Sequence, residues 1–395
     1  MNKTGIAIAG CGAVTATGLG MELLQRAVAA NASALQRREL IIGQASQSVV
    51  AGFVSDAIVG QLRTADAAHA DSRAFLFATA ALQEAVCQTE NILNSVLATR
   101  RGLVLSTTKA NIEALDKLVR QQSVSAIAQR QIQPAFLAAD LAVAFDCRGP
   151  VECVSAACIS GLSALQQGAA LIRRGLADLV FVAGVDLISQ FVLSGFNSLK
   201  SLDPDGCRPF DKSRIGLSLG EGAAAIILVK RELLSSPAIL LSGSGTSNDA
   251  NHLTGPSRDG SGLALAIRRA LAKAKIAPDQ IDYVHAHGTG TPYNDAMESL
   301  ALRSIFGDRV PPFSSSKGIF GHTLGAAGVL ETALCVAAMQ NNLLPGTPRL
   351  RERDLVAPTS LLAEPRAATK LNHVLKINCG VGGTNAAQVL ERDLP

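Results

Sequence analysis

Short apolar runs alternate with longer Ala- and Leu-rich stretches along the whole chain. Runs this short that are apolar throughout predict buried strands, because parallel strands in α/β proteins are covered on both faces. They predict strands at residues 6–9, 103–105, 179–182, 224–229, 239–241, 281–286 and 374–378. The stretches between them predict helices at residues 71–87, 161–174, 262–275 and 328–340. This alternation predicts a mixed α/β fold built in layers.

Two segments far apart in the chain resemble each other. Residues 6–12 (IAIAGCG) and residues 239–245 (ILLSGSG) each combine an apolar run with a Gly-x-Gly pair, which predicts a turn after each strand. Neither segment completes a dinucleotide-binding fingerprint. Because a chain of 395 residues also exceeds the usual size of one core, we predict two related halves, residues 1–236 and 237–395.

Composition and charge exclude several classes of protein. No uncharged apolar run approaches the length of about 18 residues that indicates a membrane span. The first residues, MNKTG, lack the basic region and apolar block of a secretory signal, so we expect a cytoplasmic protein. The eight cysteines lack the paired spacings of a zinc site and predict reduced thiols and no metal. A net charge of +4 and the absence of Trp argue against nucleic acid as the main partner.

Cys158 is the candidate nucleophile. It lies in residues 154–161 (VSAACISG), where small residues and the following Gly161 predict a sharp strand-to-helix turn. A sulfur at a helix N-terminus is expected to have a lowered pKa, because the helix dipole and free N–H groups favour the thiolate. Since most free cysteines are simply buried in the core, the turn alone does not establish catalysis.

Three Gly-rich loops carry the remaining candidate chemistry. They are residues 285–292 (HAHGTGTP), 315–328 (SSKGIFGHTLGAAG) and 378–385 (NCGVGGTN). The first and third directly follow predicted strands, where open α/β sheets place their sites. His287 and His322 lie in the first two loops. Two histidines in matched loops downstream of a candidate nucleophile favour an active site over isolated structural histidines.

Together these segments resemble the elongating β-ketoacyl-[acyl-carrier-protein] synthases, a branch of the thiolase-like superfamily. The resemblance covers nearly the whole chain, in the family's order, and also rests on residues 207–212 (CRPFDK) and 220–223 (GEGA). It implies an α/β thiolase-like fold in which two related βαβ-type halves form a five-layer αβαβα sandwich. The N-terminal half would carry the nucleophilic cysteine and the C-terminal half the two catalytic histidines.

The resemblance also implies a reaction. Cys158 would accept an acyl chain as a thioester, and decarboxylation of a malonyl-[acyl-carrier protein] would generate the enolate that attacks it. This decarboxylative Claisen condensation extends a fatty-acid, polyketide or polyene chain by two carbons. His287 and His322 would stabilise the enolate by donating hydrogen bonds to its oxygen. The backbone N–H groups of Cys158 and Val381 would form the oxyanion hole for acyl transfer.

Further site residues follow from the same resemblance. Lys317 and Glu331 match a family ion pair, which we expect to hold the loop that carries His322. Asp295 and Glu298 are expected to cap the helix that follows them. The implied substrate-binding residues are Thr289, Thr291, Gly380 and Val381.

The resemblance implies no cofactor on the chain itself, because the partner acyl carrier protein carries the phosphopantetheine. It also implies a homodimer or a heterodimer with a ketosynthase-like subunit. Residues 62–75, where the carrier usually docks, hold only two arginines, Arg63 and Arg73. A second basic cluster lies on a predicted helix at Arg268, Arg269, Lys273 and Lys275, and a solvated helix face explains it equally well.

Two segments depart from the family pattern. The usual aromatic gate, Phe-Gly-Phe, is replaced by Cys379, Gly380 and Val381. Residues 106–111 (STTKAN) replace the glycine-rich stretch at the subunit contact, where chain length is often set. The smaller gate predicts a changed order of the half-reactions or entry of stiffer and bulkier chains. Both departures favour a specialised pathway with a polyketide or polyene product.

Alternative functions stay open at this point. A thiolase would condense coenzyme A substrates with Cys379 as its base, but it does not need His287 and Lys317. The chain could be the catalytic half of a heterodimer with a chain-length factor. A chain-length factor itself typically lacks the nucleophile, which is present here. A papain-like protease is not supported by the residues around Cys158.

Overall fold

The computed structural model describes residues 5–42 and 45–393. Each predicted strand and helix overlaps an observed one. In the described ranges, no helix is long and apolar enough to cross a membrane. The residues that bear on a secretory signal, Met1 to Thr4, lie outside the described part of the chain.

The strands follow the apolar runs. They are β1 (Ile6–Thr15), β2 (Gly18–Leu19), β3 (Gln36–Ile42), β4 (Ala45–Ala51), β5 (Arg101–Ser106), β6 (Val151–Val154), β7 (Leu179–Asp186), β8 (Gly222–Lys230), β9 (Ile239–Asn248), β10 (Tyr283–His285), β11 (Phe313–Ser314), β12 (Leu343–Leu344), β13 (Arg366–Ala367), β14 (His373–Gly380) and β15 (Thr384–Arg392). β7 and β8 are buried along almost their whole length, which explains why they are apolar throughout.

The helices lie between these strands. They are α1 (Met21–Ala29), α2 (Asp56–Ala65), α3 (Arg73–Cys87), α4 (Glu90–Ser95), α5 (Ile112–Val119), α6 (Ala126–Arg130), α7 (Pro134–Ala144), α8 (Ser160–Arg173), α9 (Gln190–Ser198), α10 (Ser261–Ala274), α11 (Pro292–Phe306), α12 (Lys317–Phe320) and α13 (Ala327–Asn341). Several begin at a serine whose side chain accepts a backbone N–H of the first turn, as in α2, α3 and α9.

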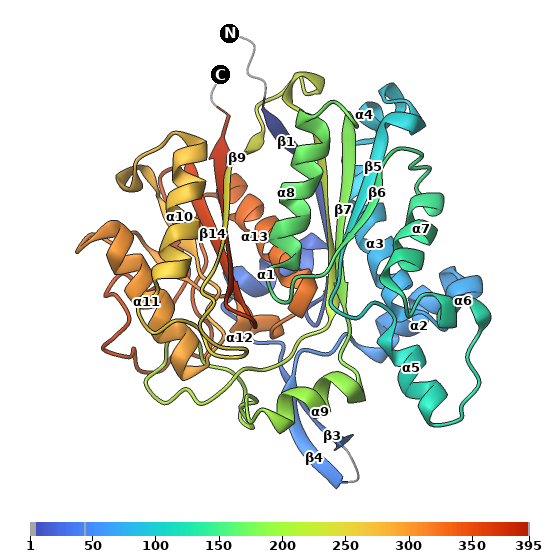
Figure 1. Cartoon of the computed structure of the whole chain (residues 1–395), viewed down its shortest axis with the longest axis horizontal. Helices are drawn as coiled ribbons and strands as arrows, with labels where there is room; N and C mark the ends of the chain where they lie inside the picture. Colours follow the sequence, from blue (N-terminus) through green and yellow to red (C-terminus); the bar gives the residue numbers. More distant parts are fainter. Residues whose placement is uncertain (1–4, 43–44, 394–395) are drawn as a thin grey trace.

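Five layers alternate across the molecule (Figure 1). The main strands pair in the order β11-β10-β14-β15-β9-β1-β8-β7-β5-β6. β1 and β9 pair only at one end, through Ala7 with Leu240 and Ile8 with Ile239, so the strands divide into two parts. α8 and α13 lie between these parts, while α10 and α11 cover one outer face and α3 and α7 the other. This is the αβαβα arrangement that the resemblance implied.

The two Gly-x-Gly pairs lie inside strands, so the predicted turns are wrong. β1 and β9 both continue through their glycines. A Cβ on Gly10 or Gly12 would lie 2.3 or 2.0 Å from a backbone oxygen of α3, and a Cβ on Gly243 or Gly245 would lie 2.1 or 2.2 Å from one of α10. The glycines are needed because a helix packs directly on each strand. The division at residue 236 into two related halves stays a prediction.

The two central helices, α8 and α13, cross where neither has a side chain. A Cβ on Gly161 would lie 2.6 Å from a backbone nitrogen of α13, and one on Gly328 would lie 2.4 Å from a backbone nitrogen of α8. Only glycine permits this approach. The crossing places the turn before α8, which contains Cys158, beside the loop before α13, which contains His322.

Candidate active site

Cys158 occupies the sharp turn between β6 and α8, as the sequence predicted. The preceding residue, Ala157, has a φ of 48°, a left-handed conformation that costs a non-glycine residue about 1–3 kcal/mol. The Ser160 hydroxyl holds this turn: it donates to the Ala157 carbonyl (2.6 Å) and accepts the Ala156 N–H (2.7 Å). The turn therefore fixes the sulfur at the start of α8.

The sulfur is buried, and its pKa is raised, whereas the sequence predicts a lowered pKa. Desolvation raises the pKa of the Cys158 thiol to about 11, although the Lys317 ammonium and the Val381 backbone N–H act in the opposite direction. A buried thiolate loses its hydration, so the neutral form is favoured. The resting thiol is therefore protonated at neutral pH, in contrast to the thiolate expected from the helix dipole.

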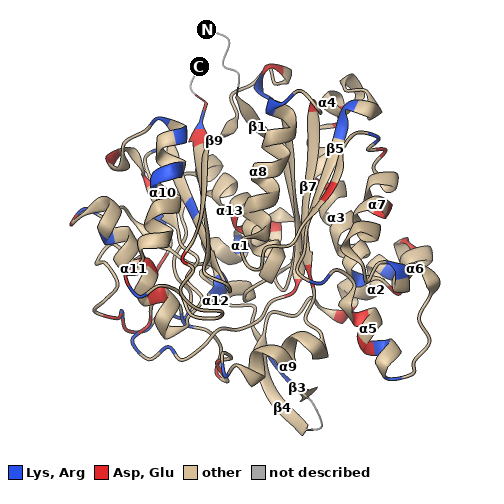
Figure 2. Ribbon diagram, viewed as in Figure 1, with Lys and Arg blue, Asp and Glu red and all other residues tan. Residues whose placement is uncertain are grey.

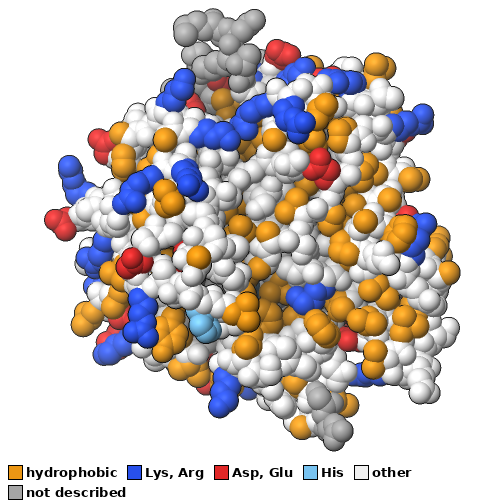
Figure 3. All heavy atoms as spheres, viewed as in Figure 1, with side chains coloured by type: hydrophobic (Ala, Val, Ile, Leu, Met, Phe, Trp, Pro, Cys, Tyr) orange, Lys and Arg blue, Asp and Glu red, His pale blue; other side chains and the backbone are white. Residues whose placement is uncertain are grey.

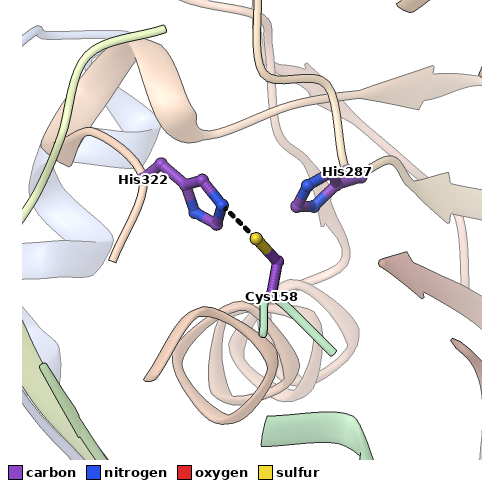
Figure 4. A group of neighbouring side chains, drawn as sticks. All are labelled: Cys158, His287 and His322. Carbon is purple, nitrogen blue, oxygen red and sulfur yellow. Dashed lines mark hydrogen bonds between the residues drawn. The ribbon is translucent and has the colours of Figure 1, made fainter. Parts of the chain in front are cut away.

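His322 faces the sulfur with a hydrogen-bond donor. Its Nε2 lies 3.0 Å from Cys158 Sγ (Figure 4). The Leu324 backbone N–H donates to His322 Nδ1 at 3.3 Å, so the ring carries its proton on Nε2. Burial and the nearby Lys317 ammonium lower the pKa of His322 to about 3, which keeps the ring neutral.

His287 lies beside the sulfur with its ring nearly perpendicular to that of His322. The ring centroids are 5.1 Å apart at an angle of 83° (Figure 4). Lys317 Nζ lies 3.3 Å from His287 Nδ1, and Asn378 Nδ2 lies 3.0 Å from it. An ammonium can only donate, so Nδ1 accepts and the Nε2–H is free to donate into the site. Burial, followed by the Lys317 charge, lowers the pKa of His287 well below its usual range.

The spacing of these three side chains could also suit a cation. Within the described residues, one ligand-type atom each of Cys158, His287 and His322 lies within 4.8 Å of the others. A metal needs a lone pair on each imidazole. Because a donor occupies Nδ1 of each ring, Nε2 carries the proton and offers no lone pair. The chemistry of this group is therefore that of two donors directed at a thiol.

A buried charge cluster supports the histidines. Glu331 pairs with Lys317 (2.5 Å) and Lys376 (2.9 Å), and all three side chains are almost completely inaccessible. The two ammonium groups hold the pKa of Glu331 well below its usual range. The Lys317–Glu331 pair joins the two ends of the loop that carries His322, as predicted. Lys317 also donates to the His287 carbonyl at 2.6 Å, which the sequence did not predict.

Asp295 and Glu298 do not cap α11, which corrects the prediction. α11 begins at Pro292, so both residues lie inside the helix and point back at the preceding loop. Glu298 accepts two N–H groups, at 2.6 and 2.7 Å, and Asp295 accepts two more, at 3.1 and 3.2 Å. These four donors are the consecutive backbone N–H groups of residues 287–290. The two carboxylates therefore fix the loop that presents His287.

A cavity of about 1160 Å³ opens at the surface and reaches Cys158 and both histidines. The four predicted substrate-binding residues, Thr289, Thr291, Gly380 and Val381, all line it. The two threonine hydroxyls are hydrogen-bonded to each other at 2.9 Å, and Val381 is 39% exposed. In Figure 3, hydrophobic side chains surround a hollow in the lower half of this face, over the lower end of α8.

The structure separates the predicted site residues into two groups. The cavity-lining group comprises Cys158, His287, His322, Thr289, Thr291, Gly380 and Val381. Lys317 and Glu331 lie behind the histidines and do not line the cavity. The segment of α12 that contains Lys317 is blue in Figure 2, near the lower end of the central helices. Lys317 and Glu331 therefore fix the two histidines without contacting a ligand in the cavity.

Two family models match this chain. Residues 3–233 match the family model described as "Beta-ketoacyl synthase, N-terminal domain", and residues 239–351 match "Beta-ketoacyl synthase, C-terminal domain". The chain belongs to the β-ketoacyl synthase family.

Relatives of this β-ketoacyl synthase chain carry names of two kinds, a polyketide β-ketoacyl synthase and a 3-oxoacyl-[acyl-carrier-protein] synthase. A "Putative polyketide beta-ketoacyl synthase 1" of Streptomyces cyaneus is 35% identical over 66% of this chain, and the match spans 65%, just under two thirds, of the relative's length. A "3-oxoacyl-[acyl-carrier-protein] synthase 2" of Coxiella burnetii is 33% identical over 67% of this chain and 69% of the relative.

A solved structure is similar along almost the whole β-ketoacyl synthase chain. It is the ketosynthase ApeO in complex with its chain length factor ApeC, from Xenorhabdus doucetiae. The TM-score is 0.87 at 29% identity, with 98% of both chains covered. The thiolase-like fold class implied by the sequence is thereby confirmed.

Two residues that position the β-ketoacyl synthase site were not singled out from the sequence. Asn378 contacts His287, and its loop had been recognised without a role for this side chain. Lys376 lies in β14, and a single lysine in an apolar strand carries no local signal of a partner 45 residues away in the chain, Glu331. Only the packing of β14 against α13 brings them together.

Proposed function

We propose that this chain catalyses the decarboxylative condensation of an acyl thioester on Cys158 with malonyl-[acyl-carrier protein], and so extends an acyl chain by two carbons. The observation that supports this most directly is the arrangement of His287 and His322 as neutral Nε2–H donors around a buried thiol. A step in which negative charge develops on an oxygen beside that sulfur requires such donors.

Acyl transfer is the first half-reaction. The Cys158 sulfur attacks the carbonyl carbon of an acyl-pantetheine thioester, the bond to the pantetheine sulfur breaks, and the departing thiolate takes the proton that Cys158 loses. The oxyanion is held by the backbone N–H groups of Cys158 and Val381. The Val381 N–H already donates toward the sulfur, and Gly380 lies so close that a Cβ there would be 3.2 Å from the Cys158 nitrogen.

Condensation is the second half-reaction. The bond between the malonyl carboxylate and its α-carbon breaks, carbon dioxide leaves, and the electron pair forms an enolate on the thioester. His287 and His322 donate to the enolate oxygen. The α-carbon attacks the acyl carbonyl, the bond to Cys158 breaks, and a proton from solvent restores the thiol. Because both donors are in place before the reaction, they need no rearrangement as charge develops.

The remaining lining residues fit a pantetheine arm. Thr289 and Thr291 offer hydroxyls along the wall of the cavity, and its rim carries two basic residues, Lys200 and Arg258. We infer that the acyl carrier protein, which supplies the phosphopantetheine, docks at this rim of the cavity. Arg73 does not contribute to docking, because it is largely buried and ion-paired with Glu113 and Glu221.

A thiolase reaction is less compatible with the site. It would require Cys379 as a base. Burial, with Glu298 and Asp249 nearby, raises the pKa of Cys379 well above its usual value. A thiolase also does not need His287 and Lys317, which contact each other beside the Cys158 thiol.

A ketosynthase-like partner subunit is supported by one edge of the sheet. β6 ends the strand order, and within the described residues it pairs only with β5. Its Val151 and the neighbouring Val143 of α7 are 39% and 82% exposed. An unpaired edge beside apolar side chains is typical of a surface that another chain covers. Homodimer and chain-length-factor heterodimer both fit this edge.

The substrate class that the gate favours is an unsaturated or stiff acyl chain. Val381 and Cys379 leave space where an aromatic gate would stand, and both line the cavity. Purified protein should therefore elongate polyunsaturated acyl carriers faster than saturated ones of equal length. Val381→Phe should reduce this preference. Equal elongation of both chains by the wild type would contradict the assignment.

Intact-protein mass spectrometry after incubation with acyl-carrier tests the activity itself. The expected result is one acyl adduct, absent in Cys158→Ala and retained in Cys87→Ala, which removes an exposed cysteine. No adduct on the wild type, or an adduct that survives Cys158→Ala, would exclude the proposed nucleophile.

A further inference from the structure

One buried carboxylate beside the site has no part in the proposed chemistry. Asp186 is the last residue of β7 and is 1% exposed. Its oxygens accept from the Thr107 hydroxyl (3.0 Å), from the Thr108 N–H and hydroxyl (both 3.0 Å) and from the Lys109 N–H (3.3 Å). They also accept the Gly325 N–H at 2.6 Å. Asp186 therefore joins two segments, residues 107–109 and the loop that carries His322.

The Gly325 contact lies next to the bond that sets the tautomer of His322. The backbone N–H of Leu324 donates to His322 Nδ1, and the next N–H along the chain, that of Gly325, donates to Asp186. Leu324 has a φ of 51°, which a leucine adopts only when its surroundings enforce it. The Asp186 carboxylate fixes the peptide that follows this strained residue.

Close packing at Gly325 strengthens the link between the two segments. A Cβ on Gly325 would lie 2.7 Å from Asp186 Oδ2 and 2.9 Å from the Thr108 nitrogen. The residue after this segment, Ala110, is also left-handed (φ 48°), and its N–H donates to the Thr107 hydroxyl at 2.8 Å. The strained backbones at Leu324 and Ala110 are thus linked to one carboxylate, the first through Gly325 and the second through Thr107.

We propose that Asp186 is a positioning residue for the condensation. By holding the 324–325 peptide against residues 107–109, its carboxylate keeps the Leu324 N–H on His322 Nδ1 and so keeps the Nε2–H directed at Cys158. The proposal deepens the proposed function and rests on it for the rate measurement alone. It also gives a role to residues 106–111, one of the two segments in which the sequence departs from the family pattern.

The test replaces the carboxylate by its isosteric amide, Asp186→Asn. Whichever way the amide is turned, its NH₂ group faces a backbone N–H, that of Lys109 or that of Gly325, so the peptide shifts without a change in side-chain volume. Decarboxylation of malonyl-carrier should fall by about 10- to 100-fold, since misplacement by about 1 Å costs that much. Acylation of Cys158 should fall less, because its oxyanion hole uses other N–H groups.

A ¹⁵N spectrum of histidine-labelled protein reports the tautomer directly. The chain has six histidines, so His322→Asn identifies the signal of His322 by difference. Wild-type protein should show only the Nε2–H form of His322, and Asp186→Asn should add the Nδ1–H form. The matched control is Asp211→Asn, which alters another buried carboxylate that accepts backbone N–H groups, from Arg351 and Glu352. It should leave the His322 signal and the ratio of the two half-reactions unchanged.

Gly325→Ala provides a second variant in case Asp186→Asn does not fold. Its methyl group would push the Asp186 carboxylate away, so it should move the tautomer and the decarboxylation rate in the same direction. An unchanged tautomer with wild-type decarboxylation, or equal losses in both half-reactions as in Asp211→Asn, would overturn the proposal. If wild-type protein accepts no acyl group, the proposed function fails, while the tautomer spectrum still decides the role of Asp186.

Discussion

The turn before α8 and the loop before α13 each hold one side chain of the site in position, but different groups stabilise their backbones. Each precedes a central helix, each contains a left-handed non-glycine residue, Ala157 or Leu324, and each presents one reactive group to the other. The first turn is held locally by the Ser160 hydroxyl, and the second by the distant Asp186 carboxylate. The comparison teaches that the Cys158 sulfur is positioned by residues next to it in the chain, whereas the hydrogen-bond donor facing it depends on residues from elsewhere in the fold.

The largest expected effect comes from removing the carboxylate of the buried charge cluster that supports the two histidines. Glu331→Gln leaves Lys317 and Lys376 buried without a carboxylate, and loss of one partner from a buried pair typically costs about 3–5 kcal/mol. The free energy of unfolding, measured in urea, should fall by that amount. The control is Glu352→Gln, which removes an exposed pair with Lys212 and should leave the free energy of unfolding nearly unchanged. Equal effects would refute the role of the cluster.

Removing the donor itself should separate the two half-reactions. His322→Asn loses the Nε2–H beside Cys158, and loss of one such donor costs about 10²- to 10³-fold in rate. We expect that loss in decarboxylation of malonyl-carrier, with acylation of Cys158 affected much less. His373→Asn, at the far end of β14, should leave both rates unchanged. A His322→Asn enzyme that decarboxylates normally would contradict the assigned donor.

One added methyl group at the crossing of α8 and α13 should push the two helices apart. Gly328→Ala places a Cβ 2.4 Å from a backbone nitrogen of α8, and such overpacking costs about 1–3 kcal/mol. The melting temperature and both half-reactions should fall together. The matched control is Gly60→Ala in α2, where a Cβ meets nothing within 4 Å and should stabilise the helix by about 0.5–1 kcal/mol.

The smallest effect concerns the ionisation of the sulfur. With the pKa of Cys158 raised to about 11, the thiolate fraction and hence the rate of alkylation by iodoacetamide should rise with pH throughout the range from 7 to 10. A thiol activated by the helix dipole would reach a plateau near neutral pH. The measurement is the pH profile of labelling at Cys158, corrected with Cys158→Ala. A plateau below pH 8 would show that the dipole outweighs burial.

Much of the site could be predicted from the sequence because its chemistry lies in short local segments. The Cys158 turn needs only small residues between a strand and a helix, and the histidine loops need glycines after strands. The departure from the family's aromatic gate is likewise contained in three consecutive residues, 379–381. Each of these signals depends on neighbours in the chain, which is what a sequence pattern records.

Other features could not be predicted because their meaning depends on contacts between distant residues. Gly10 and Gly12 have the sequence of a turn, yet they lie in a strand because α3 packs on them. Asp295 and Glu298 are expected from the sequence to cap the helix that follows them, yet they lie inside α11 and bind the loop before it. In both cases contacts with residues distant in the chain outweigh the local conformational preference.

By itself, then, the sequence determined the alternation of strands and helices and the segments that hold Cys158, His287 and His322, because periodicity and loop composition are local properties. Only the tertiary structure decided the protonation state of the site. The pKa of Cys158 follows from burial, and the position of the proton on each imidazole follows from Leu324 and Lys317. Electrostatic energies depend on the surroundings in three dimensions, and no linear pattern contains them.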